Sequence, residues 1–82
     1  MSNHNLSLYF FPECPFCQMV LNKIESLGIS EKVTFYNINK DPQAREKLID
    51  DTGRKTVPCL YIDSKPMHES SDIVAWLSKT YS

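Results

Sequence analysis

Apolar residues fall in short blocks along the chain, and their spacing predicts an alternation of strands and helices. Residues 6–11 have few polar positions and are followed by Pro12, which suits a central strand buried on both faces. Residues 33–38 are β-branched and aromatic and predict a second strand. Between them, residues 15–27 show helical spacing, with a proline at the first helical position and a glycine after the last. The apolar face of this helix is predicted to comprise Phe16, Val20, Ile24 and Leu27.

The second half of the chain predicts a shorter helix, a hairpin and a final helix. Asp41 precedes a proline as an N-cap, and Gly53 ends the helix. Residues 57–62 read as a strand, and residues 65–67 can form only a short return strand, because their proline belongs at an edge. Ser70 or Ser71 is predicted to cap the last helix, whose apolar face comprises Ile73, Val74, Trp76, Leu77 and Tyr81.

These elements give the order βαβαββα. A helical connection between the first two strands predicts a right-handed unit in which they run parallel, whereas the hairpin adds an antiparallel pair. The fold class is therefore α/β, with a four-stranded mixed sheet flanked by three helices, in a single domain over residues 1–82.

Size and charge exclude several classes of function. A chain of 82 residues buries only roughly 60% of the surface exposed when it is unfolded, so its core is small. Scattered basic residues and a net charge of -1 argue against a nucleic-acid partner. The first residues carry no basic cluster, and the run 6–11 is too short for a signal-peptide core or a membrane span. We therefore expect a cytoplasmic protein without membrane association.

The three cysteines carry the clearest chemical signal. Cys14 and Cys17 are only three positions apart and cannot join distant parts of the chain. Cys14 precedes the first helix, where free N–H groups and the positive end of the helix dipole favour a thiolate. Cys17 lies one turn further on the same side, so its sulfur can reach Cys14. The spacing predicts a redox pair that forms a Cys14–Cys17 disulfide, with Cys14 as the nucleophile and Cys17 as the resolving thiol.

Two other interpretations of this pair stay open. Both cysteines could fill the core, or they could supply half of a zinc site. Zinc needs two more ligands, and only Cys59, His4 and His68 remain, with no second CxxC and no HxxxH spacing. We therefore expect no bound metal, a buried and inert Cys59, and two solvated histidines at the surface.

Three later segments could contribute to the same site. Pro58 opens the third strand and is a candidate for a cis peptide bond, although local sequence alone favours trans. Arg54 and Lys55 are surface charges by default, yet their position directly before Thr56 places at least one of them beside the site. Residues 69–72 read locally as an acidic helix cap, and the N–H groups there also form a seat for a carboxylate.

Together these motifs resemble those of the glutaredoxins in the thioredoxin superfamily. The resemblance rests on Cys14-Pro15-Phe16-Cys17 after the first strand, Thr52-Gly53-Arg54-Lys55-Thr56-Val57-Pro58 before the third, and Ser71-Asp72-Ile73 opening the last helix. It covers roughly residues 6–76 and implies a thioredoxin-like fold with a cis bond before Pro58.

Membership of this family would imply glutathione as the electron-donating co-substrate, without a bound prosthetic group. Cys14 would attack a protein disulfide or a glutathione mixed disulfide, and glutathione would resolve the product, or Cys17 when the substrate is a protein dithiol. Glutathione reductase would be an indirect partner, and the protein is expected to be a monomer. The implied glutathione-binding residues are Arg54, Lys55, Thr56, Val57, Pro58, Glu69, Ser70 and Ser71.

One departure from the family keeps alternatives open. Common glutaredoxins have a glycine pair where this chain has His68-Glu69, and residues 69–74 are instead similar to the Glu-Ser element of glutathione transferase N-terminal domains and transferase-like bacterial glutaredoxins. A thioredoxin-like protein reduced by a flavoprotein reductase is one alternative. Another is a module that binds an iron–sulfur cluster between the Cys14 residues of two protomers with glutathione as co-ligand, against which Pro15 argues.

Overall fold

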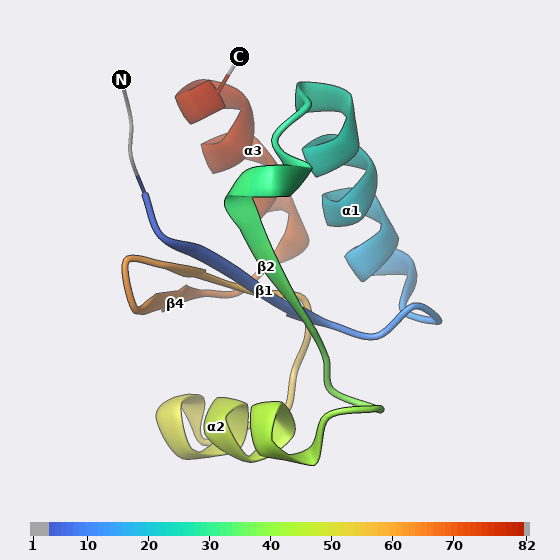
Figure 1. Cartoon of the computed structure of the whole chain (residues 1–82), viewed down its shortest axis with the longest axis vertical. Coiled ribbons are helices and arrows are strands. Elements are labelled where there is room, and N and C mark those ends of the chain that lie inside the picture. Colours follow the sequence, from blue (N-terminus) through green and yellow to red (C-terminus); the bar gives the residue numbers. More distant parts are fainter. Residues whose placement is uncertain (1–3, 82) are drawn as a thin grey trace.

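The computed structural model describes residues 4–81 and shows one sheet with helices on both of its faces (Figure 1). Its elements in chain order are β1 (Leu6–Phe10), α1 (Pro15–Leu27), the 3₁₀ helix η1 (Ser30–Lys32), β2 (Val33–Asn37), α2 (Pro42–Thr52), β3 (Cys59–Ile62), β4 (Lys65–Met67) and α3 (Ser70–Tyr81). The predicted βαβαββα order is confirmed. No helix within residues 4–81 is long and apolar enough to cross a membrane.

The four strands form a mixed sheet in the order β2-β1-β3-β4. β1 runs parallel to β2, with Leu6 opposite Val33, and antiparallel to β3, with Leu6 opposite Ile62. The hairpin between β3 and β4 turns at Asp63 and Ser64, which both have positive φ angles (51° and 75°), as two-residue hairpin turns require. The sheet therefore has β1 and β3 at its centre, as the apolar sequence of β1 predicts.

Helices α1 and α3 cover one face of the sheet, and α2 covers the other (Figure 1). Leu6, Leu8 and Leu60 point from the central strands toward α1 and α3, where they join one apolar cluster. Tyr9 and Tyr61 point to the opposite face, where α2 contributes only Ala44 and Leu48 as buried residues. Two small cores thus pack on a sheet whose central strands are apolar on both sides.

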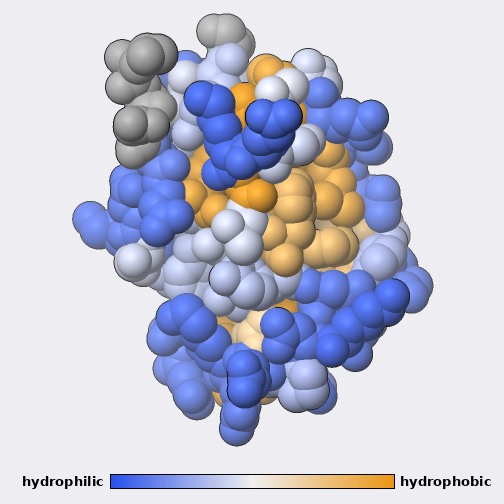
Figure 2. Space-filling view, in the orientation of Figure 1, coloured by the Kyte–Doolittle hydropathy of each residue, from blue (hydrophilic) through white to orange (hydrophobic). Residues whose placement is uncertain are grey.

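Hydrophilic residues cover α2 and the region of η1, and apolar surface gathers between them (Figure 2). The strand at the front of that view is β2, an edge strand of the sheet. Its Phe35 is 39% exposed and packs edge-on against the ring of Phe10. A single partly exposed aromatic residue of this kind is ordinary for a small domain.

The ends of α1 and α2 follow the predicted caps. Gly28 ends α1 with a φ of 69°, and Gly53 ends α2 with a φ of 74°, a conformation that suits glycine. At the start of α2, one carboxylate oxygen of Asp41 accepts hydrogen bonds from the N–H groups of Gln43 and Ala44, at 3.1 and 3.2 Å. These caps fix where both helices end and therefore where each following loop begins.

Three predicted boundaries shift in the structure. β1 and β2 each end one residue earlier than expected, at Phe10 and Asn37. The third strand was expected from residue 57 but begins at Cys59, because Pro58 has no N–H group to place in the ladder. The carbonyl of Val57 is thereby left to face the cysteine pair.

Candidate active site

Cys14 occupies the N-cap position of α1, between the end of β1 and Pro15. Its sulfur accepts a hydrogen bond from the backbone N–H of Cys17 at 3.4 Å, and its thiol lies 3.9 Å from the carbonyl oxygen of Val57. The first contact and the helix dipole stabilise negative charge on the sulfur. The strand-to-helix junction therefore places the Cys14 sulfur beside free N–H groups at the start of a helix, as the sequence predicts.

Cys17 is close to Cys14 but differs from it in environment. Its side chain is fully buried, whereas 7% of Cys14 is exposed, and all three cysteines are free thiols. Burial raises the pKa of Cys17 to about 12, and the neighbouring Cys14 sulfur adds to that rise. At neutral pH Cys17 is therefore a thiol, suited to a second step in which it attacks a disulfide already formed on Cys14.

Cys59 lies on the α2 side of the sheet and is also fully buried. Burial raises its pKa to about 11. Its expected role as a buried filler agrees with this position. Within residues 4–81 no group of three or more histidine, cysteine or acidic side chains is placed to hold a metal ion.

A cleft of about 240 Å³ lies beside the cysteine pair. Three separate parts of the chain form its walls: the start of α1, the loop from α2 to β3, and the segment from β4 to α3. The lining residues are Phe16, Arg54, Thr56, Val57, Pro58, His68, Glu69 and Ser70. Val57 connects the cleft to the reactive sulfur, because its carbonyl is the group that Cys14 contacts.

The loop that carries most of these residues is held by Thr52. Its hydroxyl donates to the carbonyl of Leu48 at 2.7 Å and accepts the N–H of Arg54 at 3.3 Å. The Val57–Pro58 peptide bond further along this loop is cis. The cis bond that the family resemblance implies is confirmed.

Six of the eight predicted glutathione-binding residues line this one cleft, although the sequence separates them into two groups. The other two, Lys55 and Ser71, are exposed and lie outside its lining. The choice between Arg54 and Lys55, which the sequence leaves open, is thus resolved in favour of Arg54 as the residue at the cleft wall. Ser71 lies one residue beyond Ser70, in the first turn of α3.

Three sequence predictions are wrong. Phe16 does not belong to the buried face of α1 but is 60% exposed at the cleft, since Cys17 is the residue that the first turn of the helix buries. His68 is not a solvated surface residue: it lines the cleft, and its Nδ1 atom is buried. His4 is half-buried, since its ring packs on Trp76 and bonds Asp63 at 2.7 Å. The sequence did contain an indication that Phe16 lies at the site, because this residue stands between the two cysteines.

The start of α3 also differs from the prediction. The helix begins at Ser70, so neither serine stands at the position before it, and Glu69 is found there with a φ of 71°. The first helical bond runs from the Ile73 N–H to the Glu69 carbonyl at 3.0 Å. The N–H groups of Ser70 to Asp72 precede that bond and are not part of the helical ladder. They form a positive end of a helix at the wall of the cleft.

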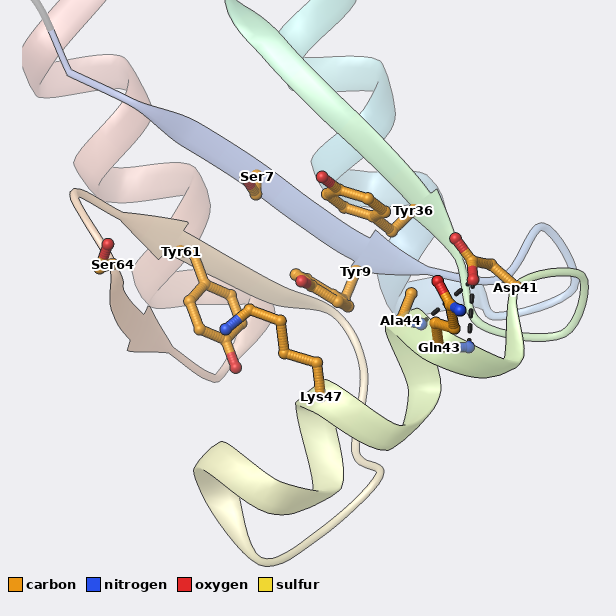
Figure 3. Close-up of a pocket in the computed structure, with 9 residues that line it drawn as sticks. All are labelled: Ser7, Tyr9, Tyr36, Asp41, Gln43, Ala44, Lys47, Tyr61 and Ser64. Atoms are coloured by element: carbon orange, nitrogen blue, oxygen red, sulfur yellow. Dashed lines mark hydrogen bonds between the residues drawn. The ribbon is translucent and has the colours of Figure 1, made fainter.

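A second cavity of about 300 Å³ lies on the α2 face of the sheet (Figure 3). Tyr9, Tyr36 and Tyr61 project into it from three adjacent strands, and Lys47 crosses from α2 to the ring of Tyr61 (Figure 3). Asp51, just outside this group, accepts hydrogen bonds from both Tyr61 and Lys47 at 2.9 Å. Of the two charged residues that line this cavity, Lys47 pairs with Asp51 and Asp41 caps the start of α2, so both have a role in holding α2 and its contacts with the sheet.

The fold and the cysteine site together define a class of protein. A CxxC pair at the start of the first helix of a thioredoxin-like fold, beside a cis proline, is the arrangement of a thiol–disulfide oxidoreductase.

Comparison with known proteins narrows this class. The family model described as Glutaredoxin matches residues 6–67. The chain is 32% identical over 73 residues to glutaredoxin 3 of Escherichia coli K12, covering 87% of this chain and 83% of that protein. It is 30% identical over 76 residues to the chloroplastic glutaredoxin-C4 of rice, covering 80% of this chain. The chain therefore belongs to the glutaredoxin family.

Two further comparisons concern length and fold. This chain spans 57% of the length of the rice protein. Among solved structures, a glutathione transferase homologue from Drosophila mojavensis with bound glutathione superposes with a TM-score of 0.74 at 22% identity, over 95% of this chain and 36% of the transferase. At that identity the likeness establishes a shared thioredoxin-like fold.

Proposed function

We propose that the protein is a glutathione-dependent thiol–disulfide oxidoreductase that reduces protein disulfides and glutathione mixed disulfides. The observation that carries the proposal is the position of Cys14, whose sulfur is stabilised by the Cys17 N–H and contacts the Val57 carbonyl at the edge of the cleft. A thiol ligand in that cleft would have its own sulfur next to the nucleophile.

The reaction would proceed in two exchanges at Cys14. The Cys14 thiolate attacks the glutathione sulfur of a mixed disulfide, which forms a Cys14–glutathione disulfide and releases the other thiol. The thiolate of a second glutathione attacks that glutathione sulfur, which regenerates the Cys14 thiolate and releases oxidised glutathione. Each cycle converts one mixed disulfide and one glutathione into one free thiol and one molecule of oxidised glutathione, which contains the glutathionyl group of the substrate.

Cys17 would take part in the reaction only when the substrate is a protein dithiol. Its thiol then attacks Cys14 and releases the reduced protein, leaving the Cys14–Cys17 disulfide for glutathione to reduce. Because the pKa of Cys17 is about 12, its proton must leave as the new bond forms. The released protein thiolate can accept that proton, which balances the step.

The cleft supports glutathione as the co-substrate through its charges. Arg54 at one wall suits the glycine carboxylate, and the free N–H groups at the start of α3 suit the γ-glutamyl carboxylate. Glu69 has the left-handed backbone that a glycine would adopt in its place. The position of Glu69 is therefore one that a glycine could occupy without a change of backbone conformation.

The test is reduction of a small glutathione mixed disulfide by glutathione, coupled to NADPH through glutathione reductase. We expect Cys14→Ser to lose activity to the uncatalysed background, and Cys17→Ser to retain activity within about threefold of the wild type, because glutathione replaces the resolving thiol. Cys59→Ser, which removes the cysteine furthest from this chemistry, is the matched control and should retain activity.

Failure of the wild type in this assay would sink the proposal. Reduction by a flavoprotein thioredoxin reductase would then identify the thioredoxin-like alternative. Visible absorption bands of an iron–sulfur cluster in freshly purified protein, lost in Cys14→Ser, would identify the cluster-binding alternative.

A further inference from the structure

His68 lies in the short segment between β4 and α3 and forms part of the cleft wall. Its Nδ1 is the one buried side-chain nitrogen or oxygen among residues 4–81 that has no hydrogen-bond partner. Buried polar atoms nearly always have partners, because an unpaired one loses its hydration without compensation. An unpaired nitrogen in the wall of a ligand cleft is therefore a reason to look for its partner on the ligand.

The next residue departs from ordinary geometry as well. Glu69 has a φ of 71°, a left-handed conformation that costs energy in a residue with a Cβ atom. Two successive residues at the rim of the cleft thus violate local rules of stability. Such departures gather at functional sites, where binding compensates for them.

The charge state of His68 decides which partner it can take. Burial lowers the pKa of His68, the nearby Arg54 lowers it further, and only Glu69 opposes them. The imidazole is therefore neutral at pH 7, with one nitrogen that donates and one that accepts. A neutral acceptor suits a cationic N–H donor.

The neighbouring groups identify where such a donor would lie. The N–H groups at the start of α3 suit a carboxylate, and His68 and Glu69 come directly before them in the chain. In an α-amino acid the ammonium group is attached to the carbon that bears the carboxylate. A ligand whose α-carboxylate binds the helix would therefore present its ammonium to the residues just before the helix.

We propose that His68 is a specificity-determining residue of the cleft, which accepts a hydrogen bond through Nδ1 from the α-ammonium of the γ-glutamyl end of glutathione. This inference rests on the proposed function. His68 then selects thiols that carry a free α-amino acid head over thiols with a carboxylate alone. Since Nδ1 is buried in the structure, this role requires the ring to rotate so that Nδ1 faces the ligand.

The experiment compares two mixed disulfides as substrates at a fixed glutathione concentration, one formed with glutathione and one formed with an analogue in which hydrogen replaces the γ-glutamyl amino group, with product thiols measured directly. Wild type, His68→Phe and His68→Asn are tested with both. Phenylalanine keeps the ring without the nitrogen, and the asparagine side-chain oxygen lies near the position of Nδ1. His4→Phe applies the same substitution to the histidine remote from the cleft.

We expect His68→Phe to raise the KM for the glutathione mixed disulfide roughly tenfold with little change in kcat, as the loss of a hydrogen bond to a charged group predicts. The KM for the mixed disulfide of the analogue should stay within about twofold. His68→Asn should recover most of the preference for glutathione, and His4→Phe should keep all of it.

Equal effects of His68→Phe on both mixed disulfides, or no effect on either, would overturn this inference and leave the proposed function standing. Loss of preference in His68→Asn as complete as in His68→Phe would also count against it, since that variant keeps an acceptor. A wild type without any glutathione turnover would overturn the proposed function and the role of His68 together.

Discussion

At the scale of single residues, burial distinguishes three cysteines that have the same side chain. Cys17 and Cys59 are fully buried, and burial raises their pKa values to about 12 and about 11. Cys14 keeps 7% of its surface exposed and has a hydrogen-bond donor at its sulfur. Reactivity in this protein is therefore a matter of position, because thiolate content and access control the rate of attack.

This difference predicts the order in which the cysteines are alkylated. In native protein at pH 7, iodoacetamide should modify Cys14 first, while Cys17 and Cys59 react at least tenfold more slowly because they remain buried thiols. Mass spectrometry of peptides from a timed reaction measures the order. The control is denatured protein, in which all three cysteines should react at similar rates. Faster labelling of Cys59 than of Cys14 in the native state would contradict the prediction that Cys14 is the most reactive cysteine.

At the scale of elements, α2 shows how a helix with little buried surface is held. Only Ala44 and Leu48 are buried from its eleven residues, and unlike α1 and α3 it adds no partly buried apolar residues to the core, so apolar packing contributes less here than in those helices. Its start is stabilised instead by Asp41, which accepts two backbone N–H groups. The loop that follows α2 forms one wall of the cleft, so the stability of this helix also matters for the site.

Asp41→Ala should therefore lower the free energy of unfolding by about 1 kcal/mol, the usual effect of losing an N-cap side chain. Urea denaturation monitored by circular dichroism measures the change. Asp50→Ala, an exposed position within the same helix, is the matched control and should change stability by less than about 0.5 kcal/mol. An equal loss in both variants would show that charge, and not the cap, is responsible.

At the scale of the whole molecule, the beginning of the chain is joined to the hairpin near its end. One carboxylate oxygen of Asp63 accepts the N–H of Asn5 at 2.9 Å, and the other lies 2.7 Å from Nδ1 of His4. These two contacts, the Asn5 bond foremost, lower the pKa of Asp63 below its usual 3.8. Asp63 thus joins the residues before β1 to the turn after β3, at one end of the two central strands.

This pKa shift predicts a dependence of stability on acid. A carboxyl group with a lowered pKa stabilises the folded state above its unfolded value of 3.8, and that contribution disappears as pH falls through the folded value. Between pH 5 and pH 2 the wild type should consequently lose more stability than Asp63→Asn. Urea denaturation at several pH values measures how steeply the free energy of unfolding falls with pH in each variant. Asp50→Asn is the control and should follow the wild type. Equal pH dependence in the wild type and Asp63→Asn would refute the role of this contact.

Much of this organisation was predictable because it depends on local chemistry. Hydrophobic spacing predicts the helices, Asp41 and Gly53 mark the ends of α2, and the position of Cys14 before Pro15 indicates a reactive thiol. These signals act over a few residues, so they are present in the sequence before any tertiary contact forms.

Other features depended on packing between distant segments. The cleft joins α1, the loop before β3 and the start of α3, so only the folded chain shows that Arg54 lies at its wall and Lys55 outside it. Helical periodicity assigned Phe16 to the core, yet the first turn of α1 buries Cys17 instead, and the Phe16 side chain is exposed. The sequence by itself determined the order of elements and the position of Cys14 at the start of α1. Tertiary structure alone decided the burial of the His68 nitrogen and the shape of the cleft, because both arise where segments distant in sequence exclude water together.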